Sequence, residues 1–413
     1  MKKLSVFILA VFVLAGCNDV SAVKNILAPL TEVVEETPEI TSDTVTSTVL
    51  FVGDLMQHGP QIKRALACGD GKTYNYDACF EFVKPKISAA TLAIGNLEVT
   101  LGGEPYSGYP QFSAPDEYLL AIQNAGFDAL TTANNHCCDR GKKGIERTLE
   151  VLGKAKIPSC GTYADSLSRS KRYPLILDAD GIKICLLTYT YGTNGIPVPK
   201  GNIVNVIDKE MMAKDIKKAK TMNADVIIAS LHWGEENVLK ENAGQRELAQ
   251  WLVDQGVDHV IGGHPHVIQP SVYLQGKDGK DHYVVYSLGN YISNMQTADN
   301  KIGLTVTLKF QKITTEGKST TTLLAVDEEK TYCSFPVLNP TGNYRVIPAS
   351  LSDSLLSDAE QKARVGSLQK KPAPAVQKIP AAKQKADSVK QKVDSLGKPS
   401  KTVRLKSRRK RAA

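Results

Sequence analysis

The central part of the chain has no excess of positive charge, although the whole chain does. The 413 residues carry a formal net charge of +8, but residues 352–413 alone hold 17 Lys or Arg and 5 Asp or Glu. The remainder therefore has a net charge of about −4. This balance argues against nucleic-acid binding by the folded part and assigns the basic character to a C-terminal tail.

Long hydrophobic runs are also missing at the N-terminus. The apolar stretch at residues 4–14 follows Lys2 and Lys3 and is too short to span a bilayer comfortably, which is typical of a secretory signal. It ends in Leu-Ala-Gly-Cys, which resembles a bacterial lipobox. The resemblance implies cleavage before Cys17 and its acylation, and so a lipid-anchored protein of the cell envelope with its domain outside the cytoplasm. The alternative is an ordinary signal peptide or short anchor with a chance cysteine.

The cysteines lack a complete set of partners. Of eight, seven remain if Cys17 is acylated, and an odd number cannot pair fully within one chain. Cys68 and Cys79 bracket a short polar loop, and the sequence leaves open whether they form a disulfide. We expect the adjacent Cys137 and Cys138 not to be bonded to each other.

Composition divides the chain into four segments. Residues 1–17 are the signal peptide, residues 18–47 a flexible tether, residues 48–350 one folded domain and residues 351–413 a basic tail rich in Lys, Ala and Pro. The tail has too few large apolar residues to fold, so we expect it to be disordered. It could serve as a solvated spacer or attract anionic polymer and lipid headgroups.

The domain alternates short β-branched strands with helical patterns, which predicts an α/β fold. Strands are expected at residues 48–52, 92–94, 129–131, 226–229 and 259–261, and helices at 118–125, 144–155, 211–221 and 245–255. Residues 175–189 and 272–286 each contain two strands around an Asp-Gly pair, which predicts hairpins. The sheets should therefore mix parallel and antiparallel strands.

Five of these strands run into loops that hold acids, amides or histidines. The loops contain Asp54 and His58; Asn96 and Glu98; Asn134, Asn135, His136 and Asp139; His232; and His264 with His266. Ligands of α/β sheets bind at the carboxyl ends of strands, so these side chains should gather at one edge. Imidazole and carboxylate together suit zinc, manganese or iron, and a carboxylate between two metals can bridge them.

Each element alone also has a structural explanation. Asp54 could cap a helix, Glu98 could be a surface acid, and His232 beside Trp233 could be a packed core histidine. His264-Pro265-His266 is harder to explain in this way, because two histidines around a proline fit a rigid metal-binding turn. A further alternative is that the metals only stabilise the fold.

The ordered set Gly-Asp, Asn-Leu-Glu, Asn-Asn-His, His-Trp-Gly-Glu and Gly-Gly-His-Pro-His resembles the calcineurin-like metallophosphatase superfamily, in its CapA branch linked to poly-γ-glutamate capsule synthesis. The sequence at residues 286–291, Tyr-Ser-Leu-Gly-Asn-Tyr, resembles the closing motif of that branch. The resemblance covers about residues 48–300. It implies a four-layer α-β-β-α sandwich of two mixed sheets.

The resemblance also implies roles for the site residues. Asp54 and His266 would bind one divalent metal, and Asn135, His232 and His264 the other, with Glu98 as the bridge. His136 would act as the acid, oriented by Asp139. The metals would be one or two ions of manganese, zinc or iron.

The sequence departs from the superfamily pattern in two places. The first motif should read Asp-x-His, but Leu55 and Met56 follow Asp54, and only His58 could replace the missing imidazole. The second motif should supply a bridging Asp, where this chain offers Asn96 and Glu98. These departures weaken the first metal site more than the second.

Two functions remain open at this stage. The first is a metal-dependent hydrolase or transferase that acts on a phosphoester or a γ-glutamyl amide of an envelope polymer such as poly-γ-glutamate. The second is a non-catalytic factor that helps to export or anchor an acidic polymer. Expected partners are this polymer, the membrane through the lipid on Cys17, and proteins of capsule synthesis or export.

Overall fold

The computed structural model describes residues 42–368 and 377–379. The expected signal peptide with Cys17, most of the expected tether and the end of the basic tail lie outside these residues. No helix within the described ranges combines the length and apolarity that membrane crossing requires.

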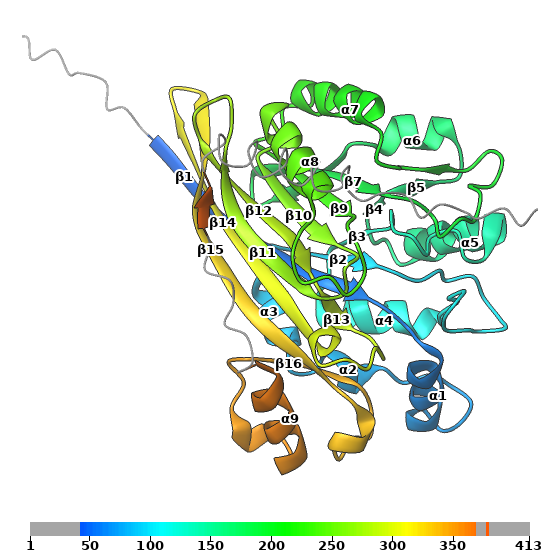
Figure 1. Cartoon of the computed structure of the whole chain (residues 1–413). Coiled ribbons are helices and arrows are strands. Elements are labelled where there is room, and N and C mark those ends of the chain that lie inside the picture. Colours follow the sequence, from blue (N-terminus) through cyan, green and yellow to red (C-terminus); the bar gives the residue numbers. More distant parts are fainter. Residues whose placement is uncertain (1–41, 369–376, 380–413) are drawn as a thin grey trace, which may run out of the picture. The chain divides into compact units, whose positions relative to one another are not determined.

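Two large mixed sheets form the centre of the domain (Figure 1). The first sheet has the order β16-β15-β14-β1-β2-β3-β4, and β13 pairs in parallel with the end of β1. Its strands are β1 (Ser42–Leu55), β2 (Leu92–Leu97), β3 (Ala129–Thr131), β4 (Ser159–Cys160), β13 (Asn290–Ile292), β14 (Ile302–Thr315), β15 (Lys318–Ser334) and β16 (Arg345–Pro348). β1 to β4 run parallel, whereas β14, β15 and β16 extend the sheet as an antiparallel meander.

The second sheet has the order β17-β11-β12-β10-β9-β7-β6. Its strands are β6 (Leu175–Ala179), β7 (Ile182–Thr190), β9 (Val226–His232), β10 (His259–Gly263), β11 (Ile268–Gln275), β12 (Asp281–Leu288) and β17 (Gln377–Ile379). The pairs β6–β7 and β11–β12 are antiparallel, which confirms both predicted hairpins, while β7, β9, β10 and β12 are parallel. A small third sheet joins β5 (Thr162–Tyr163) and β8 (Ile203–Val204).

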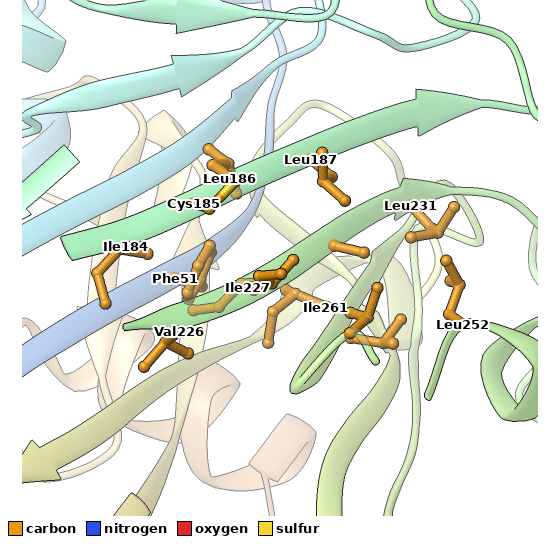
Figure 2. Close-up of a cluster of buried hydrophobic side chains, with 14 of the residues drawn as sticks. Phe51, Ile184, Cys185, Leu186, Leu187, Val226, Ile227, Leu231, Leu252 and Ile261 are labelled. Carbon is orange, nitrogen blue, oxygen red and sulfur yellow. The ribbon is translucent and has the colours of Figure 1, made fainter. Parts of the chain in front are cut away.

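The inner faces of the two large sheets pack against each other. In β1, Val49 and Phe51 point to one face and contribute to the same core as Leu186, Ile228 and Val260 of the second sheet. Figure 2 shows Phe51 of this core together with Leu186 and Ile261. Phe51 is 2% exposed. Burial of one such side chain contributes about 1.5–3 kcal/mol, so this layer is a main source of stability.

Helices cover the outer face of each sheet and complete four layers. On the first sheet, Leu50 and Val52 of β1 lie in a second core with Tyr118 and Ile122 of a helix. The helices are α1 (Gly59–Cys68), α2 (Asp77–Phe80), α3 (Lys84–Ala89), α4 (Asp116–Ala125), α5 (Gly141–Lys154), α6 (Ser166–Arg172), α7 (Lys209–Thr221), α8 (Ala243–Asp254) and α9 (Asp358–Leu368), with single turns at Asp299–Lys301, Pro336–Leu338 and Asp353–Leu355. α2, α3 and α4 pack on the first sheet, and α7 and α8 on the second. The predicted α-β-β-α sandwich is confirmed.

The folded region extends past both boundaries expected from composition, residues 48 and 350. The Thr-rich segment from Ser42 continues β1, because its backbone pairs with β14, where Ser42 lies opposite Thr315. At the other end, α9 is fixed by Glu360, which is 0% exposed and forms a buried ion pair with Arg345 of β16. Backbone hydrogen bonds at the start of β1 and a buried ion pair at α9 therefore order two segments whose polar composition predicted no fold.

Candidate metal centre

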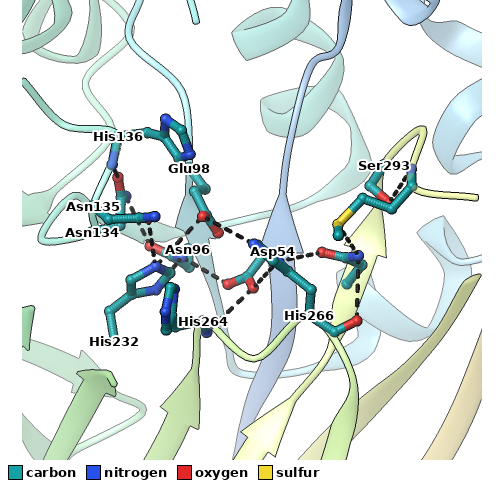
Figure 3. Close-up of polar contacts among 12 residues, drawn as sticks. Asp54, Asn96, Glu98, Asn134, Asn135, His136, His232, His264, His266 and Ser293 are labelled. Carbon is teal, nitrogen blue, oxygen red and sulfur yellow. Dashed lines mark hydrogen bonds and ion pairs between the residues drawn. The ribbon is translucent and has the colours of Figure 1, made fainter. Parts of the chain in front are cut away.

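The five predicted polar loops meet at the carboxyl ends of β1, β2, β3, β9 and β10 (Figure 3). The parallel strands of the two sheets end on the same side of the domain, so their following loops converge. The structure brings together all the residues predicted for the site: Asp54, Glu98, Asn135, His136, Asp139, His232, His264 and His266. Each of these side chains is at most 4% exposed.

Asp54 lies at the centre of the site. Its Oδ1 accepts a hydrogen bond from Nδ2 of Asn96 (2.8 Å), and its Oδ2 lies 3.2 Å from Nδ1 of His266. The preceding Gly53 is required by a close approach, because a Cβ there would lie 2.0 Å from the carbonyl oxygen of Gly289. This contact lets β13 run against the end of β1 and fixes the Asp54 backbone, whose N–H donates to the same oxygen (3.0 Å).

Glu98 is 0% exposed, yet neither of its carboxyl oxygens has a hydrogen bond within the described part of the chain. Its Oε1 lies 3.4 Å from Nε2 of His232 and 3.7 Å from Nε2 of His266. A buried carboxyl group without a hydrogen-bond partner costs free energy unless another group, such as a cation, compensates for it. This geometry fits the bridging position that the resemblance implies for Glu98.

His232 is held between two amides. Its Nε2 donates to Oδ1 of Asn135 (2.9 Å), and its Nδ1 faces Nδ2 of Asn96 at 3.4 Å. Asn96 thus contacts both Asp54 and His232, so it positions two candidate ligands.

The turn His264-Pro265-His266 has a strained backbone. His264 has a φ of +94° and His266 a φ of +56°, in a region that non-glycine residues rarely adopt. Such residues cost about 1–3 kcal/mol each and cluster at functional sites. Asn290 and Asn300 hold the turn, because the side-chain amides of both donate to the carbonyl oxygen of His266, at 3.5 and 3.0 Å.

The buried charges perturb one another strongly. Burial raises the pKa of Glu98 well above its ordinary value, and the charge of Asp54 raises it further. Burial lowers the pKa of His232 to about 3 and that of His264 to about 2. Burial alone would also lower the pKa of His266, but the carboxylates of Glu98 and Asp54 raise it to about 9.

The pKa of Asp54 moves in the opposite direction from that of Glu98. Burial would raise it, yet the hydrogen bond with His266 and the charges of His232 and His266 hold it below its ordinary value. The imidazoles therefore favour the carboxylate form of Asp54, whereas burial favours the neutral form of Glu98 as long as no cation lies beside it.

The side chains present fit divalent cations. Their ligand atoms form two sets, each with all atoms within 4.8 Å of one another: Asp54, Glu98 and His232 in one, and Glu236, His264 and His266 in the other. The unpartnered oxygens of Glu98 and the unpartnered Nδ1 of His264 are buried atoms that a cation would satisfy. Two imidazoles and a carboxylate suit zinc, manganese or iron.

His136 and Asp139 form a buried hydrogen-bonded pair beside the ligand sets. Nδ1 of His136 donates to Oδ2 of Asp139 (2.8 Å), which also accepts the backbone N–H of Phe112 (2.7 Å). The Phe112 ring stands edge-on to the imidazole with centroids 4.5 Å apart. Nε2 of His136 is thereby turned away from Asp139, toward Nδ2 of Asn194 at 3.4 Å.

Sequence reasoning missed three residues that the structure places at the site: Tyr191, Asn194 and Glu236. Nδ2 of Asn135 donates to Oδ1 of Asn194 (3.2 Å), and the ring of Tyr191 lies 4.5 Å from that of His264. All three lie just after the carboxyl end of β7 or β9, and this position was the one indication in the sequence that they belong to the site. Nothing in their local sequence separates them from ordinary loop residues.

His58 does not join either ligand set. Its Nδ1 accepts the backbone N–H of Asn294 (3.2 Å), and its ring packs edge-on against Phe112, with centroids 5.2 Å apart. As the residue that precedes α1, it contributes to the cap of that helix. Its side chain therefore makes structural contacts. It does not replace the histidine that the superfamily pattern has two positions after Asp54.

The seven cysteines within the described ranges are all unbonded. Cys68 and Cys79 are thus not joined in this structure. Cys137 and Cys138 are unbonded as expected, with their sulfur atoms 3.9 Å apart.

Comparison with known families gives one match that spans the site. The family model described as "Bacterial capsule synthesis protein PGA_cap" matches residues 48–295, which is more than half of the chain. This range contains all five polar loops and the closing motif at residues 286–291.

Individual proteins agree with this match. The chain is 30% identical over 257 residues to the capsule biosynthesis protein CapA of Bacillus anthracis, which covers 59% of each chain. It is 29% identical over 270 residues to the PGA biosynthesis protein CapA of Bacillus subtilis, covering 62% of this chain and 66% of that protein. The matched region thus spans less than two thirds of either relative.

The structure is also similar to that of the calcineurin-like phosphoesterase YfkN from Bacillus subtilis, with a TM-score of 0.43, 15% identity, and coverage of 79% of this chain and 98% of that one.

Proposed function

The chain belongs to the bacterial capsule synthesis protein family PGA_cap, and from that premise we propose that it acts in the synthesis of poly-γ-glutamate or a related anionic envelope polymer, as a metal-dependent hydrolase or transferase. The main support for a catalytic metal is the environment of Glu98. Its carboxyl group is fully buried beside His232 and His266 and has no hydrogen bond among the described residues. A purely structural role gives no reason to bury such a group among histidines.

The metal would be held by Asp54, Glu98, Asn135, His232, His264 and His266. When bound, divalent cations would supply Lewis acidity that polarises the oxygen of a scissile amide or phosphoester. The chain's own residues would do the rest. Asp139 orients His136 through Nδ1, so that Nε2 of His136 can take up a proton and pass it to the leaving atom of a substrate on that side. Phe112 keeps the imidazole in place and shields the Asp139 contact from water.

The test is to incubate the full chain, loaded with manganese or zinc, with poly-γ-glutamate of defined length and separately with simple phosphoesters. New amino termini and shortened chains are expected for γ-glutamyl cleavage, and free phosphate for phosphoester cleavage. His136→Gln should abolish whichever product forms, because Gln cannot transfer the proton, while metal content stays unchanged.

An assembly factor without catalysis is the second candidate, and the absence of a histidine two positions after Asp54 favours it. In cells that make the polymer, a His136→Gln protein would then support normal polymer export. Loss of the polymer with His136→Gln, despite normal protein levels, would exclude this candidate.

We also propose that the protein is held at the envelope through lipid on Cys17, on the basis of the lipobox-like sequence alone. Labelling of the protein with a radioactive fatty acid should be lost in Cys17→Ser. Equal labelling of both proteins would remove this part of the proposal.

A further inference from the structure

We propose that Glu236 completes a second cation site with His264 and His266, so that the centre offers two ligand sets although the loop after Asp54 lacks a histidine. This inference deepens the proposed function, because it rests on a metal centre at this edge of the sheets. It assigns a direct role to an exposed acid that no motif singles out.

The first argument is the geometry of the three side chains. Their ligand atoms all lie within 4.8 Å of one another. His264 and His266 are 3% and 2% exposed, and Nδ1 of His264 has no hydrogen-bond partner among the residues described. Within the same ranges, the carboxylate of Glu236 makes no hydrogen bond or ion pair. The set thus contains a histidine with an unpartnered ring nitrogen and a carboxylate without a hydrogen bond or ion pair among the described residues.

The second argument is that the backbone holds Glu236 in this position. The N–H of Trp233 donates to the carbonyl oxygen of Gly263 (3.1 Å), and the N–H of Asn237 donates to that of Pro265 (2.8 Å). Pro265 is the residue between the two histidines. The loop of Glu236 is therefore attached directly to the turn that presents His264 and His266.

A side-chain contact also holds this loop. Oδ1 of Asn237 accepts a hydrogen bond from Nδ2 of Asn300 (2.9 Å), and Asn300 also binds the carbonyl oxygen of His266 (3.0 Å). One buried amide thus connects the residue after Glu236 to the residue that would share its cation. Asn300 is 1% exposed, so this connection is shielded from water.

The third argument is the occupation of His58, the other candidate to replace the missing imidazole. Its Nδ1 accepts the backbone N–H of Asn294, and its ring packs on Phe112. Glu236 has no such engagement. The additional ligand of the centre is therefore Glu236 in the loop after β9, and not His58 in the loop after β1.

The two sets should bind cations with different strengths. Asp54, Glu98 and His232 are at most 3% exposed, whereas Glu236 is exposed to solvent. A cation in the Glu236 set stays accessible to water and to chelators, so it should exchange more readily. We infer that the centre holds one tightly bound and one exchangeable divalent cation.

The experiment is a calorimetric titration of the metal-free full chain with Mn²⁺ and, separately, with Zn²⁺, beside measurement of bound metal after gel filtration. The wild type should bind two equivalents of unequal affinity. In Glu236→Gln the tighter equivalent should remain and the weaker one should lose at least about 100-fold in affinity, because loss of an outer partner alone costs 10–100-fold. Glu235→Gln, an exposed neighbour outside the set, should behave as the wild type.

The outcomes separate this inference from the proposed function. Two equivalents with unchanged affinities in Glu236→Gln would overturn the role of Glu236 and leave the metal centre intact. A single equivalent in the wild type that Glu236→Gln does not weaken would do the same, and no binding by the wild type would overturn both proposals. Equal unfolding midpoints of the metal-free proteins would show that the substitution acts on the cation and not on the fold.

Discussion

Nδ2 of Asn194 lies 3.4 Å from Nε2 of His136 and faces it as a donor. The orientation of the amide is fixed, because its Oδ1 accepts from Nδ2 of Asn135 and from the hydroxyl of Tyr191, both at 3.2 Å. His136 is therefore an acceptor at Nε2 and a donor at Nδ1. A loop residue thus sets the tautomer of the proposed acid.

The first prediction concerns this tautomer. In Asn194→Asp a carboxylate oxygen replaces the donor, so Nε2 of His136 should gain a hydrogen in addition to the one that Nδ1 donates to Asp139. The ¹⁵N chemical shifts of its two ring nitrogens should move accordingly in two-dimensional NMR spectra. His282 is the internal reference, because its Nδ1 bonds the carbonyl oxygen of Asp258 (2.9 Å), remote from this loop. Unmoved His136 signals in the variant would show that Asn194 does not keep Nε2 of His136 free of a hydrogen.

A second prediction concerns Gly53. In Gly53→Ala the new Cβ would meet the carbonyl oxygen of Gly289 at 2.0 Å, so β13 must move away from β1. We expect a loss of about 2–3 kcal/mol in the free energy of unfolding, together with weaker metal binding, since Asp54 follows directly. Gly153→Ala is the control, because a Cβ there meets nothing within 4 Å and lies in helix α5. It should be neutral or slightly stabilising; similar losses in both variants would contradict the steric explanation.

A third prediction tests the buried ion pair of Arg345 and Glu360. Arg345 is 3% exposed, and Ser334 also donates to Glu360 (2.7 Å). Glu360→Ala should cost about 3–5 kcal/mol in denaturant unfolding, because it leaves a guanidinium buried without its main partner. The double variant with Arg345→Met should recover much of this loss. A single-variant loss below about 1 kcal/mol would mean that α9 is not held by this pair.

A fourth prediction concerns acid stability. Burial, with a smaller contribution from His282, lowers the pKa of His259 to about 3, and Nδ1 of His259 accepts the backbone N–H of Tyr283 (3.2 Å). Between the ordinary pKa of 6.5 and about 3, the unfolded chain binds a proton that the folded protein does not. Stability from His259 is therefore complete above pH 6.5 and declines as the pH falls below it, by up to about 1.4 kcal/mol per pH unit.

His259→Asn keeps an acceptor and does not titrate, so its unfolding free energy should fall less steeply between pH 6.5 and 4. Urea unfolding of both proteins at several pH values measures the difference. Parallel curves would refute the assignment of this acid sensitivity to His259.

The sequence predicted the parallel strands and the loops that follow them because both depend on local patterns. β3, for example, was predicted at residues 129–131, where the structure has it, and Asn135 and His136 follow it. The long hairpin of β14 and β15 was not predicted, because much of β15 is polar and exposed, with no clear hydrophobic face. Glu236 and Asn194 were missed for another reason: their positions depend on how two sheets meet, and spacing along the chain contains no such distance.

The placement of β1 has a consequence for biogenesis. This strand is the first of the domain, yet it lies in the interior of its sheet, between β2 and β14, and Asp54 lies near its end. As the chain is synthesised from its N-terminus, one edge of β1 stays unpaired until residues near 315 have emerged. The last member of the two ligand sets is His266, so both sets can close only after most of the domain has been made, and cations of the proposed centre should be acquired late in synthesis or after it.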